Sequence, residues 1–340
     1  MAFQTVLLCG SRVYDAVRKP LCECLYRREE DDNRLQGASE QKRESGTPEP
    51  EKVNTQSQSV AQRWLTALIA IPIVLIFAWL GGWFAFTAIL LIVVLNTLEI
   101  RSMLLHAGYH PLIWVSFGLS VLLLISAMLA SYRLLLIEVG VGSALLISFL
   151  LILCRKRLDG ALVDWALTLA VAVYLGWPMS CLLLLRGYDP GAFHFGAAQW
   201  LTLPDGVWWL LVILLGVWGF DGAAFFSGRY FGRHKLAPMI SPAKTWEGVI
   251  GGLALSIIAS LVLTVVPLHV PWYLAILLGV LVGGAATLGD LAESLIKRQT
   301  HVKDSGQIMP GHGGMLDRTD SILFAAIIVY IFVQFLQIPG

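Results

Sequence analysis

Long apolar segments, separated by short polar connections, follow one another along most of this chain from residue 64 onward. Each is close to the roughly 20 residues that a helix needs to cross the hydrocarbon core of a bilayer. Helices are the expected form, because lipid offers a backbone group no hydrogen-bond partner outside its own segment. The pattern therefore predicts an all-α, polytopic integral membrane protein with about nine transmembrane helices. The predicted segments are 64–80, 83–100, 111–130, 134–154, 161–185, 207–226, 249–266, 272–296 and 321–335.

The N-terminal stretch, residues 1–60, has a different composition, rich in charged and small polar side chains. Such a stretch cannot bury enough apolar surface to offset the entropy of ordering, so we expect a disordered tail. Residues 61–206 then form a first group of helices, and residues 207–340 a second group that holds the polar motifs. The whole chain is 57% hydrophobic and 14% charged, whereas a soluble domain has about 25% charged residues. Its net charge of +1 gives no indication of nucleic-acid binding.

Basic residues lie mainly on one side of the predicted bundle. The connections after the even-numbered segments hold nearly all of the Lys and Arg in the helical region, whereas the opposite side holds only Arg133 and Arg186. Because positive charge favours the cytoplasmic side of a membrane, we expect the N-terminus and the polar motifs in the cytoplasm. A bacterial inner membrane is the preferred location, and a eukaryotic organelle membrane stays open.

The densest polar stretch, residues 294–320, lies at the end of one apolar segment and before the next. Its charges have both signs, and a charge at the bilayer centre costs about 2.5–3.5 kcal/mol, so we place it at the membrane–water interface. Cations for phosphate oxygens, carboxylates for metal and glycines for close backbone approach suit the handling of phosphate. Its candidates are Lys297, Arg298, Lys303, Asp304, His312, Asp317, Arg318 and Asp320.

A polar stripe begins inside the preceding apolar segment. Asp290, Glu293, Ser294 and Lys297 recur at helical spacing and share one face. On an apolar helix such a stripe is expected to line a cavity or an interface. A helix that simply leaves the membrane is an alternative explanation for Lys297, and a weaker one for the deeper Asp290. Asp320, at the start of the last apolar segment, is more simply explained as a helix cap.

A second polar stretch, residues 221–248, follows the sixth apolar segment. Its glycines would let backbone approach a ligand closely. Arg229 and Lys244 can hold phosphate, Arg bidentately and Lys as a point charge. Ordinary cytoplasmic loop charge would explain the two cations. It would not explain Asp221 after one apolar run or Glu247 before the next.

Together the two stretches resemble the motifs of the phosphatidate cytidylyltransferases, also called CDP-diacylglycerol synthases. The C-terminal pattern of that family reads S-x-hydrophobic-K-R, then K-D, P-x-H-G-G and D-R-x-D, and every fixed position is filled here, with Met309 at a site usually Leu, Ile or Phe. Chance matches over so many spaced positions are very rare. In the upstream pattern Gly222 replaces a usual Thr and Phe225 a usual Tyr. The upstream matches are Asp221, Gly228, Arg229, Gly232, Ser241, Pro242, Lys244, Thr245 and Glu247.

The resemblance implies an enzyme that transfers a cytidylyl group from CTP to phosphatidate, giving CDP-diacylglycerol and pyrophosphate. It also implies Mg²⁺, alone or with a second cation, held by Asp290 and Asp317, and a homodimer in membrane lipid that binds no nucleic acid. The implied catalytic residues are Asp290, Asp317, Lys297, Arg298 and His312. The implied substrate-binding residues are Asp221, Arg229, Ser241, Lys244, Glu247, Lys303, Asp304 and Arg318.

His312 has two interpretations that the sequence leaves open. It could bind phosphate or help to protonate the leaving group near neutral pH. It could equally hold a turn through backbone hydrogen bonds.

Two other classes of membrane protein use similar residues. An ion-coupled transporter could bind cations on intramembrane carboxylates, but its site would be expected near the midplane, whereas these charges gather at one face. A CDP-alcohol phosphotransferase needs the pattern D-G-x-x-A-R, and here Asp221-Gly222 is followed by Ala-Ala-Phe-Phe. The cytidylyltransferase therefore remains the preferred class, with the transporter as its alternative.

Overall fold

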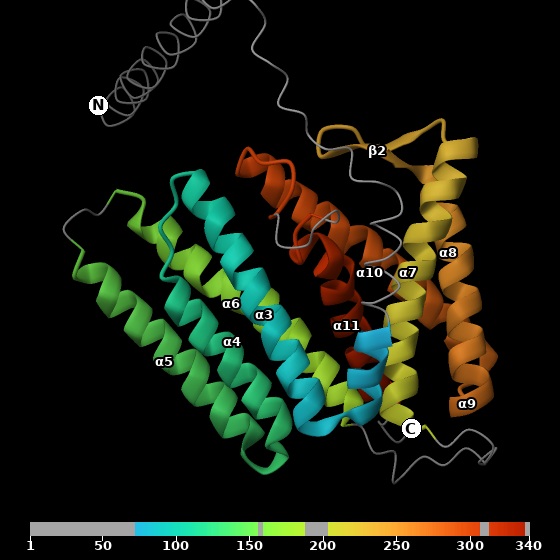
Figure 1. The fold of residues 1–340 in the computed structure, drawn as a ribbon, viewed down its shortest axis with the longest axis horizontal. Coiled ribbons are helices and arrows are strands. Elements are labelled where there is room, and N and C mark those ends of the chain that lie inside the picture. Colours follow the sequence, from blue (N-terminus) through green and yellow to red (C-terminus); the bar gives the residue numbers. More distant parts are fainter. Residues whose placement is uncertain (1–71, 156–158, 188–202, 307–312, 337–340) are drawn as a thin grey trace, which may run out of the picture. The chain divides into compact units, whose positions relative to one another are not determined.

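The structure, a computed structural model, describes residues 72–155, 159–187, 203–306 and 313–336. All of them belong to the unit Ser59–Gly340, and the predicted disordered tail lies outside them. They form a bundle of helices with a two-stranded hairpin (Figure 1). The elements are α3 (Gly82–His106), α4 (Ile113–Met128), the short η1 (Ala130–Tyr132), α5 (Arg133–Leu153), α6 (Ala161–Arg186), α7 (Asp205–Phe231), β1 (Lys235–Ala237), β2 (Ser241–Thr245), α8 (Trp246–Ser260), the π-helical η2 (Leu261–Val265), α9 (Val266–Leu268), α10 (Trp272–Gln299) and α11 (Leu316–Leu336).

Among the described residues, 7 helical segments are long and apolar enough to cross a membrane. Helix α4 is apolar too but shorter, at 16 residues, and residues 72–80 are helical at the edge of the described part. The expectation of a largely helical, polytopic membrane protein is therefore confirmed. The predicted number of about nine spans is reached only if these two shorter helices also cross the bilayer.

A sharp break separates helical residues 72–80 from α3, where the sequence places two adjacent glycines. Gly81 and Gly82 have φ values of 64° and 51°, in the left-handed region that favours glycine. Arg186, the last residue of α6, closes this break because its Nη2 donates a hydrogen bond of 2.7 Å to the carbonyl oxygen of Trp79. A cation thus satisfies a carbonyl that a helix C-terminus leaves without an intrahelical partner.

An antiparallel hairpin joins α7 to α8 and departs from the entirely helical fold that we expected. Its strands β1 and β2 place Lys235 opposite Thr245 and Ala237 opposite Ser241. The hairpin lies at the top of the bundle in Figure 1, beyond the ends of α7 and α8. Open strand edges are excluded from lipid but tolerated in water, which explains why a strand pair forms in this polar connection.

Helix α11 joins two groups of helices. In the first group α4 packs against α3, α5 and α6; in the second, α8 packs against α7 and α10. Helix α11 packs against α10 and α7 from the second group and against α6 and α3 from the first. One hydrophobic cluster includes residues from both groups, among them the fully buried Leu124, Ile213 and Leu323. The two predicted parts, 61–206 and 207–340, therefore share a core.

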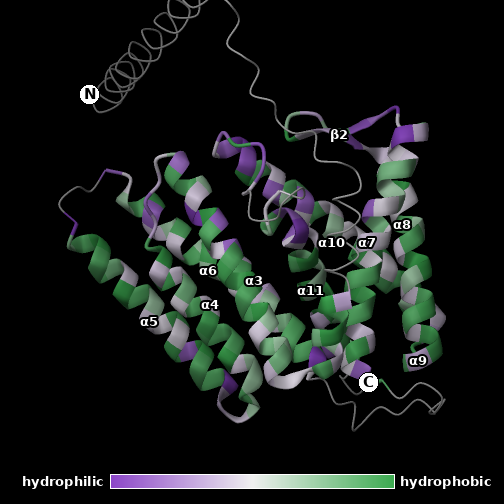
Figure 2. Ribbon diagram, viewed as in Figure 1, coloured by the Kyte–Doolittle hydropathy of each residue, from purple (hydrophilic) through white to green (hydrophobic). Residues whose placement is uncertain are grey.

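Polar residues concentrate at one end of the helices. Figure 2 shows hydrophobic residues along the helices and hydrophilic ones at the end where the hairpin and the polypeptide after α10 lie. The connections α3–α4, α5–α6, α7–α8 and α10–α11 all meet this end (Figure 1). This alternation agrees with the predicted path of the chain, and it brings both polar stretches to the same end.

Candidate active site

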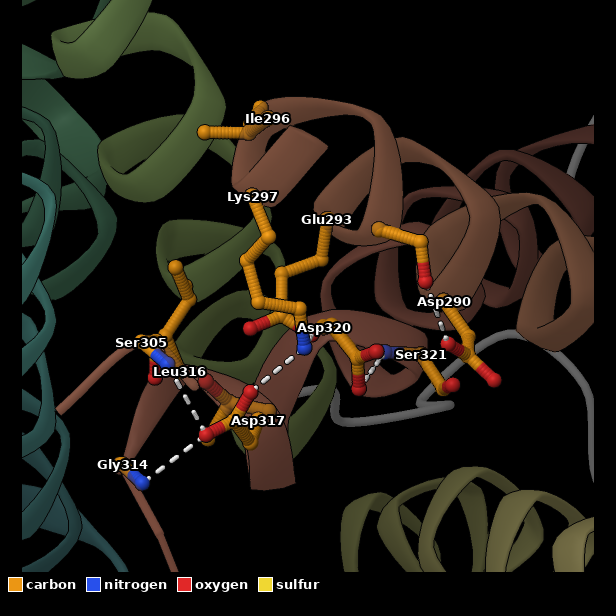
Figure 3. Close-up of polar contacts among 12 residues, drawn as sticks. Asp290, Glu293, Ile296, Lys297, Ser305, Gly314, Leu316, Asp317, Asp320 and Ser321 are labelled. Carbon is orange, nitrogen blue, oxygen red and sulfur yellow. Dashed lines mark hydrogen bonds and ion pairs between the residues drawn. The ribbon is translucent and has the colours of Figure 1, made fainter. Parts of the chain in front are cut away.

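Helix α10 presents the predicted polar stripe as one face. Lys297 Nζ lies 3.1 Å from Glu293 Oε2, one turn away, and Ser294 Oγ lies 3.4 Å from Asp290 Oδ1. Glu293 is 1% exposed, so its carboxylate is enclosed by protein. The alternative of a helix simply leaving the membrane does not account for these contacts, because the stripe turns toward the other helices (Figure 3).

Helices α10 and α11 approach each other closely beside this stripe. A Cβ added at Gly289 would lie 2.9 Å from the Cα of Ser321, so only glycine permits this packing. Ser321 Oγ donates a hydrogen bond of 3.1 Å to the carbonyl oxygen of Ala286. The close approach places Asp320 of α11 within electrostatic range of Asp290 of α10.

Asp317, at the start of α11, holds residues that precede and follow the segment 307–312. Its Oδ1 lies 2.7 Å from Lys297 Nζ. Its Oδ2 accepts hydrogen bonds from the backbone N–H groups of Gly314, at 2.9 Å, and Ser305, at 3.2 Å. Lys297 therefore bridges α10 and α11 between two carboxylates, as Figure 3 shows.

Strand β2 brings the upstream motif to the same place. Lys244 Nζ lies 2.6 Å from Asp290 Oδ2. Asp221 of α7 lies within electrostatic range of Asp290, Asp320 and Lys244, and also of Arg318. Two motifs that are far apart in sequence therefore meet at the polar end of the bundle. We call the charged residues that meet there the array: Asp221, Lys244, Asp290, Glu293, Lys297, Asp317 and Asp320.

Asp290 and Asp317 occupy different parts of this array. Each pairs with its own lysine, Asp290 with Lys244 and Asp317 with Lys297. Glu293 and Asp320 lie between them (Figure 3). The sequence interpretation gave Asp320 only a capping role and Glu293 only a place in the stripe. Both are buried, and an ionisable residue buried within a membrane helix was the available signal.

The array suits a hard divalent cation. Its ligands would be carboxylate oxygens, and one of them, Glu293 Oε1, is buried without a hydrogen-bond partner in the described part of the chain. Within the same part, no group of at least 3 His, Cys, Asp or Glu side chains is arranged so that it could hold a metal ion by itself. Mg²⁺ commonly uses only one or two carboxylates together with substrate phosphates and water, so the residues present fit this ion.

Three predicted site residues bond to backbone near the hairpin. The carboxylate of Glu247 accepts hydrogen bonds from the N–H groups of Arg233, at 3.1 Å, and His234, at 3.3 Å, and pairs with the His234 ring at 2.7 Å. Arg298 Nε donates to the carbonyl oxygen of Ile240 at 3.2 Å. Ser241 begins strand β2, opposite Ala237 of β1. These contacts give Glu247 and Arg298 a part in holding the hairpin over the array.

The remaining predicted residues lie at the polar end. Arg229 and Arg318 are exposed on α7 and α11. Lys303 and Asp304 line a hollow of about 420 Å³ between the end of α3 and the residues after α10. His312 lies outside the described residues, so its two interpretations stay open.

A glycine of the upstream motif has a packing role that the sequence did not indicate. We expected the glycines of this motif to let backbone approach a ligand. A Cβ added at Gly228 would lie 3.0 Å from Thr245 Oγ1 and 3.6 Å from the Cα of Gly248. Thr245 in turn caps α8 by accepting a hydrogen bond from the Gly248 N–H at 3.2 Å. Gly228 therefore permits α7 and α8 to pack closely, which positions Lys244 beside α10.

Glu99 is a buried carboxylate that the sequence interpretation missed. It lies on α3, far upstream of both motifs, yet it accepts hydrogen bonds from Ser305 and from the N-terminus of α11. A single carboxylate inside an apolar segment was the available signal, because burying such a group without partners is costly.

Known proteins resemble this chain over most of its length. The sequence model of the cytidylyltransferase family matches residues 61–336. A phosphatidate cytidylyltransferase from Synechocystis sp. is 34% identical over 289 residues, which cover 81% of this chain and 97% of that protein. One from Staphylococcus haemolyticus is 37% identical over 268 residues, 77% of this chain and 94% of its own. One from Haemophilus influenzae is 46% identical over 129 residues, 35% of this chain and 43% of its own.

These similarities extend across the helices of both groups and include both polar stretches. They confirm the resemblance inferred from the motifs. The array of lysines and carboxylates and the family match point in the same direction, and the chain belongs to the cytidylyltransferase family.

Proposed function

We propose that this membrane enzyme transfers the cytidylyl group of CTP to phosphatidate. The observation that best supports this reaction is the meeting of Lys244, Lys297 and several carboxylates between α7, β2, α10 and α11. Cations are needed to bring two phosphate-bearing substrates together, and carboxylates are needed to hold a metal ion beside them. Relatives named phosphatidate cytidylyltransferase give the substrates.

The reaction is a displacement at the α-phosphorus of CTP. A phosphate oxygen of phosphatidate forms the new bond to this phosphorus, and the bond from it to the bridging oxygen of the β-phosphate breaks. The products are CDP-diacylglycerol and pyrophosphate. Catalysis of such a transfer depends mainly on positioning and on electrostatic stabilisation of the developing charge. Lys244 and Lys297 orient the phosphates from within the array, and Arg229, Arg298 and Arg318 supply charge around it.

Asp290 and Asp317 are the proposed metal ligands, and Glu293 and Asp320, which lie between them, are further candidates. These carboxylates would hold Mg²⁺, whose charge would stabilise the negative charge that develops on the phosphates. The lysines that pair with Asp290 and Asp317 keep these carboxylates oriented. The remaining substrate-binding residues are proposed to contact substrate directly or through the hairpin. They are Lys303 and Asp304, in the hollow after α10, and Asp221, Ser241 and Glu247.

The membrane arrangement that we propose has about nine spans, with α4 and residues 72–80 included. The polar end is proposed to face the cytoplasm, where CTP is available, and the basic residues at this end support that side by the positive-inside rule. A bacterial inner membrane and a homodimer complete the proposal. The lipid substrate would reach the array sideways between helices, since its acyl chains stay in the bilayer.

The orientation predicts which residues an impermeant thiol reagent can reach. In a cysteine-free variant, Met239→Cys at the hairpin tip should be protected in intact cells and should react after permeabilisation. Tyr132→Cys, at the opposite end of the bundle, should react in intact cells. Both positions are exposed, at 92% and 62%, so a difference in labelling reports the side of the membrane. The reverse labelling pattern would place the array on the wrong side for CTP.

The activity itself is tested with purified protein, labelled CTP and phosphatidate, with and without magnesium. We expect label in the lipid fraction and equimolar pyrophosphate, both dependent on magnesium. An ion-coupled transporter would form neither product, so the absence of labelled lipid from folded protein would contradict the enzyme and revive that alternative.

A further inference from the structure

Glu99 is a charged side chain at an unexpected place. It lies near the polar end of α3, a helix of otherwise mainly apolar residues, and is 3% exposed. Burial of a carboxylate is costly unless hydrogen bonds replace its water. Its partners therefore show what this residue does in the fold.

Within the described part of the chain, its hydrogen bonds come from residues that precede and follow the segment 307–312. Glu99 Oε1 accepts from the backbone N–H of Met315 at 2.7 Å. Oε2 accepts from the N–H of Leu316 at 2.9 Å and from Ser305 Oγ at 3.0 Å. Met315 and Leu316 are at the start of α11, where N–H groups lack partners within the helix and favour a negative charge.

The packing around this carboxylate leaves no spare room. A Cβ added at Gly306 would lie 2.8 Å from Glu99 Oε1, and one added at Gly314 would lie 2.5 Å from Oε2. The two stretches before and after residues 307–312 thus converge on one side chain of α3. Glu99 ties the first group of helices to the segment that enters α11.

Asp317 depends on the same stretches. Its Oδ2 accepts from the N–H groups of Ser305 and Gly314, each of which also lies against Glu99. Asp317 follows directly after Leu316, whose N–H Glu99 holds. A shift of Ser305 or Gly314 would move the Asp317 carboxylate away from Lys297, with which it pairs at 2.7 Å.

We propose that Glu99 is a positioning residue for cytidylyl transfer, acting through the backbone of residues 305–306 and 314–316 to hold Asp317 in the array. The expected effect on turnover rests on the proposed function. The hydrogen bonds of Glu99 to Ser305, Met315 and Leu316 are a property of the fold. Catalytic geometry is sensitive to displacements of about 1 Å. Looser positions of residues 305–306 and 314–316 should therefore affect the rate of the reaction more than the stability of the fold.

The test compares Glu99→Gln and Glu99→Ala with Ile100→Ala, a neighbouring core residue of α3 that is 2% exposed. We expect kcat to fall about 10- to 100-fold in Glu99→Ala, because hydrogen bonds to a charged group are lost. Glu99→Gln should also be impaired, since one of its two oxygens becomes a donor facing donors. The KM for CTP should change much less than kcat, because Glu99 does not contact substrate.

Hydrogen–deuterium exchange provides a readout that does not depend on activity. The amides of Met315 and Leu316 should exchange faster in Glu99→Ala than in the parent protein. In Ile100→Ala their exchange rates should not change, even if this variant loses as much thermal stability as Glu99→Ala. Unchanged exchange in Glu99→Ala, or a kcat loss in Ile100→Ala as large as that in Glu99→Ala, would overturn the proposal. A parent protein that forms no CDP-lipid would instead refute the proposed function. Hydrogen–deuterium exchange would still test whether Glu99 protects the amides of Met315 and Leu316.

Discussion

Asp290→Asn and Asp317→Asn should each lower the rate of CDP-lipid formation by orders of magnitude while the protein stays folded and inserted. Asparagine keeps the size and polarity of the side chain but removes the charge that would hold a metal ion and that now pairs with Lys244 or Lys297. The electrostatic contribution of a catalytic metal is several kcal/mol, and each ~1.4 kcal/mol corresponds to about tenfold in rate. Turnover with labelled CTP, corrected for folded protein, is the measurement.

The double variant and a matched control sharpen this prediction. Asp290→Asn combined with Asp317→Asn should be little worse than either single change, because groups that act as one unit are strongly non-additive. Asp304→Asn should be milder, since Asp304 is exposed at the hollow after α10 and lies outside the array. Near-normal turnover of Asp290→Asn at low magnesium would show that the deep carboxylate is structural, with Lys244 as its partner.

Lys297→Met should reduce both turnover and stability. Lys297 Nζ lies between Glu293 Oε2 and Asp317 Oδ1, and its side chain is 17% exposed. Removing one partner of a buried ion pair costs about 3–5 kcal/mol because the other charge is left uncompensated. We expect a lower melting temperature in detergent and a loss of turnover of at least about 100-fold, from the loss of a cation that orients phosphate.

A second substitution separates the two effects of Lys297. In Lys297→Met with Glu293→Gln, one of the two stranded carboxylates is gone, and Asp317 keeps its backbone hydrogen bonds from Ser305 and Gly314. The melting temperature should therefore recover in part while turnover stays low. Lys303→Met, which removes an exposed lysine near the same end, should leave the melting temperature unchanged. Recovery of turnover together with stability in the double variant would mean that Lys297 only stabilises the fold.

Several features of the site were predictable from local spacing. The stripe Asp290, Glu293, Ser294 and Lys297 needed only the period of a helix, and the contacts within α10 confirm it. The predicted apolar segments 64–80 and 83–100 leave residues 81 and 82 between them, and both of these glycines adopt positive φ at the observed break. Such features depend on a few neighbouring residues, and so they can be inferred without knowing how helices pack.

Other features were missed for a common reason. Gly228 was expected only to approach a ligand, and its packing against Thr245 at the junction of α7 and α8 was not foreseen. Asp320 was treated as a cap, although it lies between Asp290 and Glu293. Glu99 was not considered at all. Each role depends on a partner distant in sequence, and the spacing of residues along the chain does not specify that partner.

The sequence by itself determined the membrane class, the helical elements, the polar end and the family, because apolar length, charge bias and spaced motifs are properties of the linear chain. Tertiary structure alone decided which charges meet. It pairs Lys244 with Asp290 and Lys297 with Asp317, and it inserts Glu99 beneath the start of α11. The physical reason is that small residues such as Gly289 set how closely two helices approach, and that distance decides which buried charges can compensate one another.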